Sequence, residues 1–289
     1  MSVAVVDPRL GWNLVEDVRR LFDYAFMVNA LRAGSLVAVT AALVGWFMVL
    51  RRQSFAGHTL AVVGFPGGAG AVLVGASAPV GSFVFCVLGA AVLAVAGSRR
   101  DRPATDGATI GLVQAAALAC GFLFATLGGG NVNAAGSLLF GTFLGITGRE
   151  VGLLLGVAIV AVVTLSALAR PLLFASVDPD VAAARGIRVR ALSFVFLLLL
   201  AVAAAAAAQI TGALLVFALL VLPAATAQAL TTRPARSLLV TVGVALAVTW
   251  LGLAIAYYSP WPVGFWITTV AFGAYVAARG AATSARRWA

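Results

Sequence analysis

Long apolar runs, each about the length of a membrane-crossing helix, recur along the whole chain. About 20 apolar residues in a helix are needed to cross about 30 Å of hydrocarbon. Nine runs of roughly this length are separated by short polar or glycine-rich segments: 33–50, 55–78, 80–96, 109–127, 151–173, 191–209, 212–230, 238–257 and 261–278. The pattern predicts an all-α, polytopic transmembrane helical bundle of eight or nine spans.

Composition supports a membrane protein and excludes two other classes. The 289 residues are 63% hydrophobic and 10% charged, whereas a soluble domain carries about 25% charged residues. The net charge of +10 comes entirely from arginine, since the chain has no lysine. The arginines lie in short segments between apolar runs, as in membrane proteins, so nucleic-acid binding is excluded. Without a lysine the chain also cannot form a Walker A phosphate loop.

The apolar runs divide the chain into three parts. Residues 1–30 mix charged and apolar residues, and the apolar residues of 10–26 recur at helical spacing. This N-terminal segment is predicted to be either an amphipathic helix at the membrane interface or a solvated tail. Residues 31–279 form the predicted transmembrane domain, and residues 280–289 form a tail.

Arginine is distributed unevenly between the two sides of the predicted bundle. Alternating spans place 14 of the 19 arginines in loops on one side, whereas the opposite loops between spans hold only Arg149. Loops rich in positive charge remain in the cytoplasm. We therefore expect a multi-pass protein of a bacterial cytoplasmic membrane, with the arginine-rich loops and the C-terminus in the cytoplasm and the N-terminus outside.

Two prolines and one short segment interrupt the regular pattern. Pro66 lies within the run 55–78, and Pro223 lies within the run 212–230. Proline removes a helical hydrogen bond, so broken helices are predicted at both positions, either lining a pathway or forming plain kinks. The apolar segment 137–146 is too short to cross and fits a re-entrant or surface half-helix, or part of a bent crossing.

A polar segment separates two of the long apolar runs near the middle of the sequence. Asp178 and Pro179 are typical of a helix start, because the aspartate can cap free N–H groups and proline tolerates the first turn. Gly186 is typical of a helix end. The loop 174–190 is therefore predicted to display a short helix toward a cytoplasmic partner.

His58 is the only histidine of the chain, and it lies near the start of the run 55–78. An ionisable residue within the membrane is a candidate functional residue, and histidine is a common ligand of transition metals. The alternative is a histidine at a helix end that bonds a carbonyl group or water. The chain has no carboxylate pair, Ser/His/Asp set or H-x-E pattern in its spans, so we expect no enzyme.

Several short motifs, considered together, resemble those of one family of transporters. In order and spacing, the chain resembles the membrane permease subunit of metal-ion (zinc/manganese) importers of the ATP-binding cassette type, over about residues 33–276. The segments that carry the resemblance are Arg-Arg-Gln-Ser-Phe-Ala-Gly (51–57), Gly-Phe-Pro-Gly (64–67), Leu-Phe-Gly (139–141), Asp-Pro-Asp-Val-Ala (178–182), Gly-Ala-Leu-Leu-Val (212–216) and Leu-Pro-Ala-Ala (222–225).

The resemblance implies a transport subunit without catalytic activity of its own. It implies a dimeric permease core, with a second identical copy expected, a separate ATPase subunit and an extracytoplasmic metal-binding protein. ATP binding by the partner would drive the dimer from inward- to outward-facing, which is alternating access for a divalent zinc or manganese ion, with no permanently bound cofactor. The short helix would be the coupling helix, contacting the ATPase through Asp178, Pro179, Asp180, Ala183, Arg185 and Gly186.

The chain departs from the family where the family has a metal-binding pair. The family usually shows an aspartate after Ser-Phe-x-Gly and a histidine four residues later, on one helix face. Here those positions are His58 and Val62. We expect a softer, weaker transit site at His58, in a pathway that includes Val62 and Pro66. The loss of the aspartate and the histidine supports one alternative, a permease for a metal chelate such as a siderophore or cobalamin complex. A secondary transporter is a further alternative, but the intramembrane carboxylates that usually couple such a transporter to an ion are missing here.

Overall fold

The computed structural model is helical and contains no strand in the residues that it describes. These residues are 19, 21–97, 107–128, 136, 138–141, 145–213 and 215–287. The helices are α2 (Ala25–Leu50), α3 (Ser54–Leu73), α4 (Ala78–Gly97), α5 (Gly107–Leu127), α7 (Gly148–Val177), α8 (Pro179–Ala184), α9 (Val189–Thr211), α10 (Val216–Leu230), α11 (Pro234–Tyr257) and α12 (Val263–Arg287). The all-α prediction is confirmed for this part of the chain.

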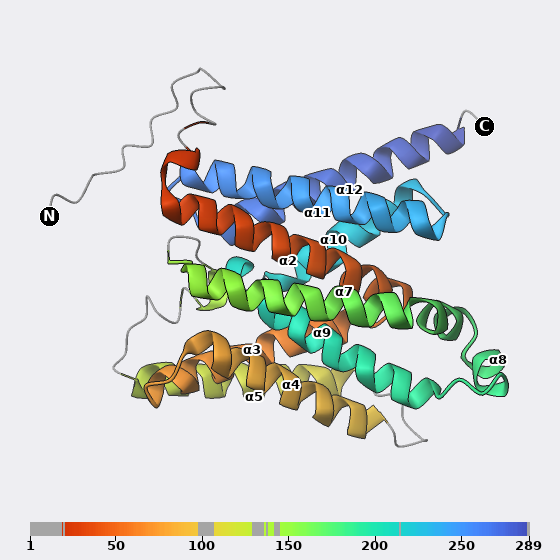
Figure 1. The fold of residues 1–289 in the computed structure, drawn as a ribbon, viewed down its shortest axis with the longest axis horizontal. Helices are drawn as coiled ribbons and strands as arrows, with labels where there is room; N and C mark the ends of the chain where they lie inside the picture. The colour runs from red at the N-terminus through yellow and green to blue at the C-terminus, as the bar shows by residue number, and fades with distance from the viewer. Residues whose placement is uncertain are drawn as a thin grey trace, which may run out of the picture.

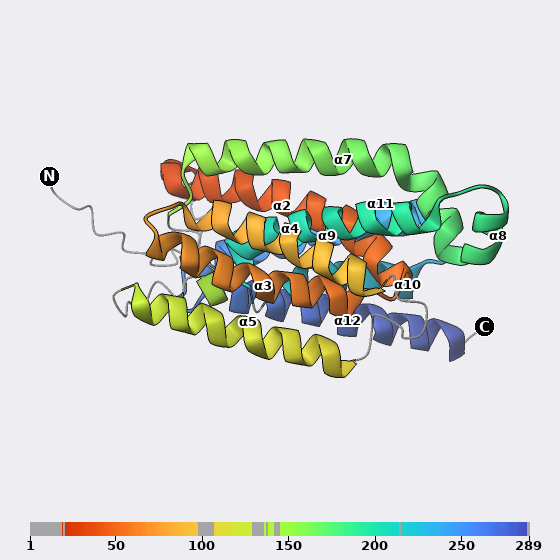
Figure 2. The same cartoon turned by 90° about the horizontal axis from the view of Figure 1, so that it is seen from below.

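The long helices lie side by side along the longest axis of the molecule (Figure 1). Successive long helices run in opposite directions, so the loops gather at the two ends of the bundle (Figures 1 and 2). The short helix α8 lies at the end where α7 finishes and α9 begins. The described arginines in or beside the loops at this end are Arg51, Arg52, Arg185, Arg188, Arg190, Arg233 and Arg236, and the last turns of α12 contain Arg279, Arg286 and Arg287.

Helix α9 lies in the interior of the bundle, where it contacts α2, α3, α4 and α7. Its alanines Ala203, Ala204, Ala205, Ala206 and Ala207 are each at most 1% exposed. Side chains this small let transmembrane helices approach closely. The alanine run is therefore a packing surface.

Glycine allows an even closer approach between α3 and α4. A Cβ atom at Gly67 would lie 2.4 Å from the carbonyl oxygen of Gly81, and one at Gly81 would lie 2.2 Å from that of Gly67. Nearby, the thiol of Cys86 on α4 donates a hydrogen bond to the carbonyl of Leu60 on α3, at 3.1 Å. The two helices thus pack backbone against backbone.

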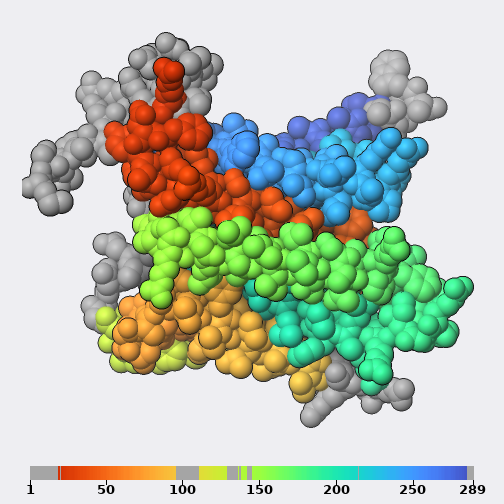
Figure 3. Space-filling model, in the orientation of Figure 1, coloured from red at the N-terminus to blue at the C-terminus, as the bar shows by residue number. Residues whose placement is uncertain are grey.

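Helix α7 carries an apolar outer face. It forms a continuous band across the side of the molecule seen in the space-filling view (Figure 3). Its side chains Leu155, Ile159 and Val163 are exposed. Apolar side chains on the outside of a bundle suit contact with lipid or with another membrane helix.

Judged by helix length and composition, the described part of the chain has fewer candidate membrane spans than the nine apolar runs predict. Six described helices are long and apolar enough to cross a membrane: α2, α3, α4, α7, α9 and α11. Two shorter apolar helices cover 111–127 and 216–230. Helix α10 has 15 residues, about 22 Å at 1.5 Å per residue, because the chain turns at Gly212 with φ 76° before α10 begins. The predicted count of eight or nine spans is not confirmed.

The helices do not break at the two prolines, so the prediction that broken helices line a pathway there is wrong, and the alternative of plain kinks stays a prediction. Pro66 lies inside the continuous helix α3, and Pro223 lies inside the continuous helix α10. Both prolines are buried. A proline costs one hydrogen bond, but packing against neighbouring helices keeps a membrane helix intact around it.

Several predicted boundaries shift in the structure. Helix α2 begins at Ala25, so it extends into the N-terminal segment predicted at 1–30, whose residues 1–18 lie outside the described part. Helix α12 continues to Arg287, into the predicted tail 280–289. Of the segment 137–146, only 138–141, 145 and 146 are described, with helical residues at 138–140.

The loop around α8 is also narrower than the predicted range 174–190. Helix α7 extends to Val177, and α9 already begins at Val189. The apolar residues after Pro171 continue the helical pattern, and Asp178 ends it by adopting extended backbone angles of φ −144° and ψ 97°. A single residue therefore ends α7 and begins α8.

Candidate transport site and coupling helix

The start of α8 is fixed by the side chain of Asp178. Its carboxylate accepts hydrogen bonds from the backbone N–H groups of Asp180, at 3.1 Å, and Val181, at 3.0 Å. Pro179 occupies the first helical position, where its missing N–H costs nothing. The helix start predicted from these residues is confirmed.

The end of α8 is fixed by Gly186, as predicted. Gly186 adopts φ +84°, a left-handed conformation that favours glycine. Its N–H donates to the carbonyl of Ala183, and the N–H of Ile187 donates to that of Ala182, at 2.9 and 3.1 Å. These bonds satisfy carbonyl groups that would otherwise have no partner at the helix end.

Most of α8 is available for contact with another protein. Ala182 is fully buried and anchors the helix against the bundle. The exposed residues are Pro179, Asp180, Val181, Ala183, Ala184, Arg185 and Gly186. The loop with α8 projects beyond the ends of α7 and α9 (Figure 2). The exposed surface therefore combines an acidic, a basic and several small apolar side chains.

His58 lies in the second turn of α3 and is partly buried. Its ring packs edge-on against the ring of Phe217 on α10, with centroids 5.7 Å apart. The Nδ1 atom is buried and has no hydrogen-bond partner. A buried nitrogen without a partner is costly, so Nδ1 is available to bind a ligand.

The two other predicted pathway residues offer no ligand atom. Val62 and Pro66 follow His58 at intervals of four residues on α3, and both are buried. No group of three or more histidine, cysteine, aspartate or glutamate residues that could hold a metal ion occurs among the described residues. The described site in one chain is thus a single imidazole with apolar neighbours.

Thr59, the residue after His58 on α3, forms a polar contact with Gln114 on α5. The Gln114 amide on α5 donates to the Thr59 hydroxyl at 3.2 Å, and this hydroxyl donates to the carbonyl of Phe55 at 2.9 Å. These polar atoms bond one another rather than His58. Together they join α5 to the first turns of α3.

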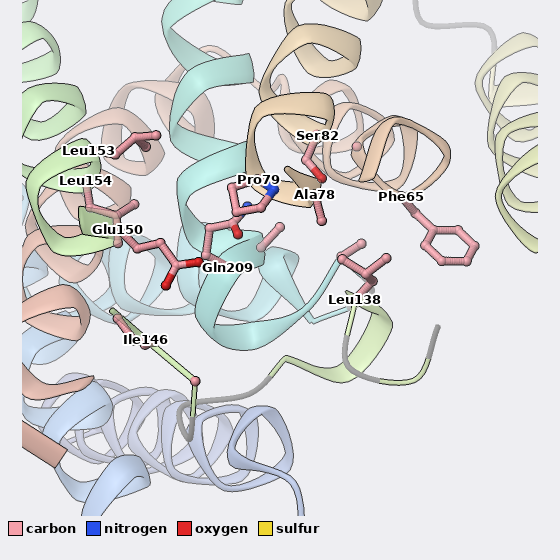
Figure 4. A pocket seen from close by; sticks show the side chains of 14 residues that line it. Phe65, Ala78, Pro79, Ser82, Leu138, Ile146, Glu150, Leu153, Leu154 and Gln209 are labelled. Atoms are coloured by element: carbon pink, nitrogen blue, oxygen red, sulfur yellow. The ribbon is translucent and has the colours of Figure 1, made fainter. Parts of the chain in front are cut away.

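A cavity of about 170 Å³, shown in Figure 4, lies near the starts of α4 and α7 and the end of α9, and therefore opposite the bundle end that carries α8. Helices α3, α4, α7 and α9 contribute to its lining, which includes Ser82, Glu150 and Gln209. The Glu150 carboxylate accepts hydrogen bonds from the backbone N–H and hydroxyl of Thr147, at 2.8 and 3.1 Å. Because Glu150 caps α7, where the helix dipole opposes a cation, we do not assign a metal site to this cavity.

Comparison with known proteins identifies the family. The sequence profile of the ABC 3 transport family matches residues 23–281. The chain belongs to the ABC 3 transport family. This result confirms the resemblance drawn from the sequence motifs, and it disfavours a secondary transporter.

Two curated relatives and one solved structure show how far the similarity to other proteins extends. The manganese transport system membrane protein MntC of Halalkalibacterium halodurans is 31% identical over 76% of this chain and 75% of its own length. The chelated iron transport system membrane protein YfeC of Yersinia pestis is 30% identical over 89% of this chain and 86% of its own length. The structure of PsaBC from Streptococcus pneumoniae in complex with Fab superposes with a TM-score of 0.81, at 25% identity, over 91% of this chain and 94% of that chain.

Two of the motifs that this ABC 3 family member shares with metal-ion permeases meet in space. The N–H of Ala213 donates to the carbonyl of Leu138 at 3.0 Å. Gly141 and Gly212 both have positive φ, and a Cβ at either one would lie within 2.4 Å of the backbone of the other segment. The motifs at 139–141 and 212–216 therefore form one backbone-to-backbone junction, which only glycine permits.

Sequence reasoning missed two neighbours of the His58 turn. Phe217 on α10 contacts the imidazole, and Gln114 on α5 bonds the adjacent Thr59. Both lie far from His58 along the chain. Their residue types and spacing carried no signal of this proximity, which results from the packing of α5 and α10 on α3.

Proposed function

We propose that this chain is the membrane permease subunit of an ATP-driven importer for a divalent transition-metal ion of the zinc or manganese kind. A separate ATPase subunit hydrolyses ATP, an extracytoplasmic protein delivers the ion, and a second copy of the chain completes the pathway. The observation that carries the proposal is α8, an exposed, doubly capped helix in a member of the ABC 3 transport family.

The bundle end that carries α8 faces the cytoplasm in this proposal. Most of the described arginines lie in the loops or in the helix ends at this end of the bundle, in agreement with the tendency of positive segments to remain inside. The ATPase would contact α8 through Asp178, Pro179, Asp180, Ala183, Arg185 and Gly186. Hydrolysis by that partner would move α8, and the permease itself would carry out no chemistry.

The ion would pass His58 on α3. Its unpartnered, buried Nδ1 can bind a divalent ion, whereas Val62 and Pro66 shape the apolar wall beside it. Imidazole suits zinc and iron, and carboxylates suit manganese. A single imidazole per chain makes a soft, weak site, and an identical second copy would bring a second imidazole. The similarity of the chain to a manganese and to a chelated iron transport protein supports a metal cargo.

Transport by the reconstituted complex tests this function. The chain, its ATPase and its binding protein are placed in proteoliposomes and offered Mn²⁺, Zn²⁺, Fe²⁺ or Co²⁺, with and without ATP. We expect ATP-dependent accumulation of at least one free ion. A ferric siderophore complex is offered in parallel. Accumulation of the complex but of no free ion would replace the ion by a chelate as cargo, and accumulation without ATP would contradict the proposal.

A further inference from the structure

Arg51 occupies the corner between α2 and α3, and its guanidinium group makes three contacts. One nitrogen, Nη2, donates to the hydroxyl of Ser193 at 2.7 Å, and Nη1 lies 3.4 Å from the hydroxyl of Ser176. The guanidinium carbon lies 5.3 Å from the centre of the Phe196 ring. A charged donor strengthens a hydrogen bond, and an arginine over an aromatic face adds a cation–π attraction.

The partners of Arg51 stand on both sides of the coupling helix. Ser176 is the penultimate residue of α7, just before α8, and Ser193 lies in the first turns of α9, just after it. The Ser176 hydroxyl also donates to the carbonyl of Leu172, which fixes its position on α7. The guanidinium group of Arg51 therefore joins the end of α7 to the start of α9, the two segments that flank α8 in the chain.

The corner that carries Arg51 is tightly bound to the helix that carries His58. The N–H of Arg51 donates to the carbonyl of Phe47 and that of Gln53 to the carbonyl of Met48, each at 2.9 Å, which joins the corner to the end of α2. The N–H of Gly57 on α3 donates to the carbonyl of Gln53 at 3.2 Å, which joins the corner to α3. A Cβ at Gly57 would lie 2.4 Å from the sulfur of Met48, so the first turn of α3 rests directly on the last turn of α2. Any movement of this corner displaces the turn of α3 next to His58.

We propose that Arg51 is a positioning residue that transmits the movement of α8 to α3. When the ATPase shifts α8, the ends of α7 and α9 move with it, and the guanidinium group carries this displacement to the corner at which α3 starts. The inference rests on the proposed function, because it needs an ATPase that moves α8. It assigns a separate task to Arg51: to couple the two sites, without contacting either partner or ion.

The inference predicts that removing the charge of Arg51 uncouples transport from ATP hydrolysis. Arg51→Gln is compared with Arg52→Gln, a matched control that removes the same charge from an exposed neighbouring side chain. For Arg51→Gln we expect intact binding of the ATPase and basal ATP hydrolysis, with ions moved per ATP reduced at least fivefold. Arg51→Lys, which keeps the charge, should recover part of the coupling, and Arg52→Gln should behave as wild type.

A double-mutant cycle distinguishes loss of the Arg51 contacts from a folding defect of Arg51→Gln. Ser176→Ala and Ser193→Ala together remove the two hydroxyl partners and leave the arginine in place. This double variant should show the same uncoupling, and adding Arg51→Gln to it should produce little further loss. Wild-type ratios of ions to ATP in the double variant would overturn the inference.

Transport by the wild-type complex, measured beside Arg51→Gln, distinguishes a failure of this inference from a failure of the proposed function. If the wild-type complex transports and Arg51→Gln transports with an unchanged ratio of ions to ATP, only the role of Arg51 is overturned. If the wild-type complex shows no ATP-dependent accumulation of any of the four ions or of the ferric siderophore complex, the proposed function fails and the inference fails with it.

Discussion

The proposed coupling helix α8 and the His58 region of α3 differ in what determines their structure. Asp178 and Gly186 fix the two ends of α8 through bonds between residues at most five positions apart. His58, in contrast, lies against Phe217 from α10, and its neighbour Thr59 bonds Gln114 from α5. The coupling helix is thus specified locally, whereas the environment of His58 is specified by the packing of the whole bundle.

This difference predicts that α3 is far more sensitive than α8 to small changes of packing. In Gly67→Ala the new methyl group would meet the backbone of Gly81, since no flexible side chain can move aside. We expect destabilisation of about 1–3 kcal/mol, seen as a lower midpoint of thermal unfolding in detergent and a lower yield of monodisperse protein.

Gly152→Ala on α7 is the matched control for this variant. No atom lies within 4 Å of the added methyl group, and alanine favours a helix over glycine by up to about 1 kcal/mol. Its midpoint should equal or exceed that of the wild type. Equal midpoints for the two variants would contradict the backbone contact between α3 and α4.

Loss of the N-terminal cap of α8 should weaken binding of the ATPase subunit and leave the stability of the whole bundle nearly unchanged. Asp178→Ala removes the acceptor for two N–H groups, at a cost of about 1 kcal/mol confined to α8. We expect an about fivefold weaker affinity for the ATPase subunit, measured in detergent, with the thermal midpoint nearly unchanged.

Asp178→Asn keeps the capping oxygen and removes the charge. This variant should bind the ATPase nearly as well as the wild type if capping is the main role of the residue. An equally large loss in both variants would instead indicate that the carboxylate contacts the ATPase directly.

The smallest effect is expected at the polar contact beside His58. Gln114→Ala removes one hydrogen bond to Thr59 from a partly exposed position on α5. Hydrogen bonds between membrane helices contribute about 0.6 kcal/mol on average. The thermal midpoint should fall only slightly, and a large loss of transport with an unchanged midpoint would show that Gln114 belongs to the ion pathway.

The same contrast explains how much the sequence could predict. Local chemistry made the capping of α8 predictable from Asp178, Pro179 and Gly186, and apolar run lengths predicted an all-helical membrane protein. The motif order indicated the family, which the profile match confirms. Each of these features depends on short segments of sequence that can be interpreted without knowing the packing.

Features that depend on packing were predicted poorly. The breaks expected at Pro66 and Pro223 do not occur, because neighbouring helices support both prolines within continuous helices. The junction of Gly141 with Gly212 and the contact of Phe217 with His58 join segments distant in sequence. A single sequence gives residue types and spacing, and these do not specify which helices become neighbours.

The most direct test of the central claim compares ion uptake by the wild type and by His58→Phe in the same reconstituted complex. Phenylalanine preserves the ring contact with Phe217 and removes the nitrogen atoms that could bind an ion. We expect the initial rate of ATP-dependent metal uptake to fall at least tenfold, with unchanged ATPase binding and basal hydrolysis. Uptake of the same ions at the wild-type rate would show that His58 is not the transit site.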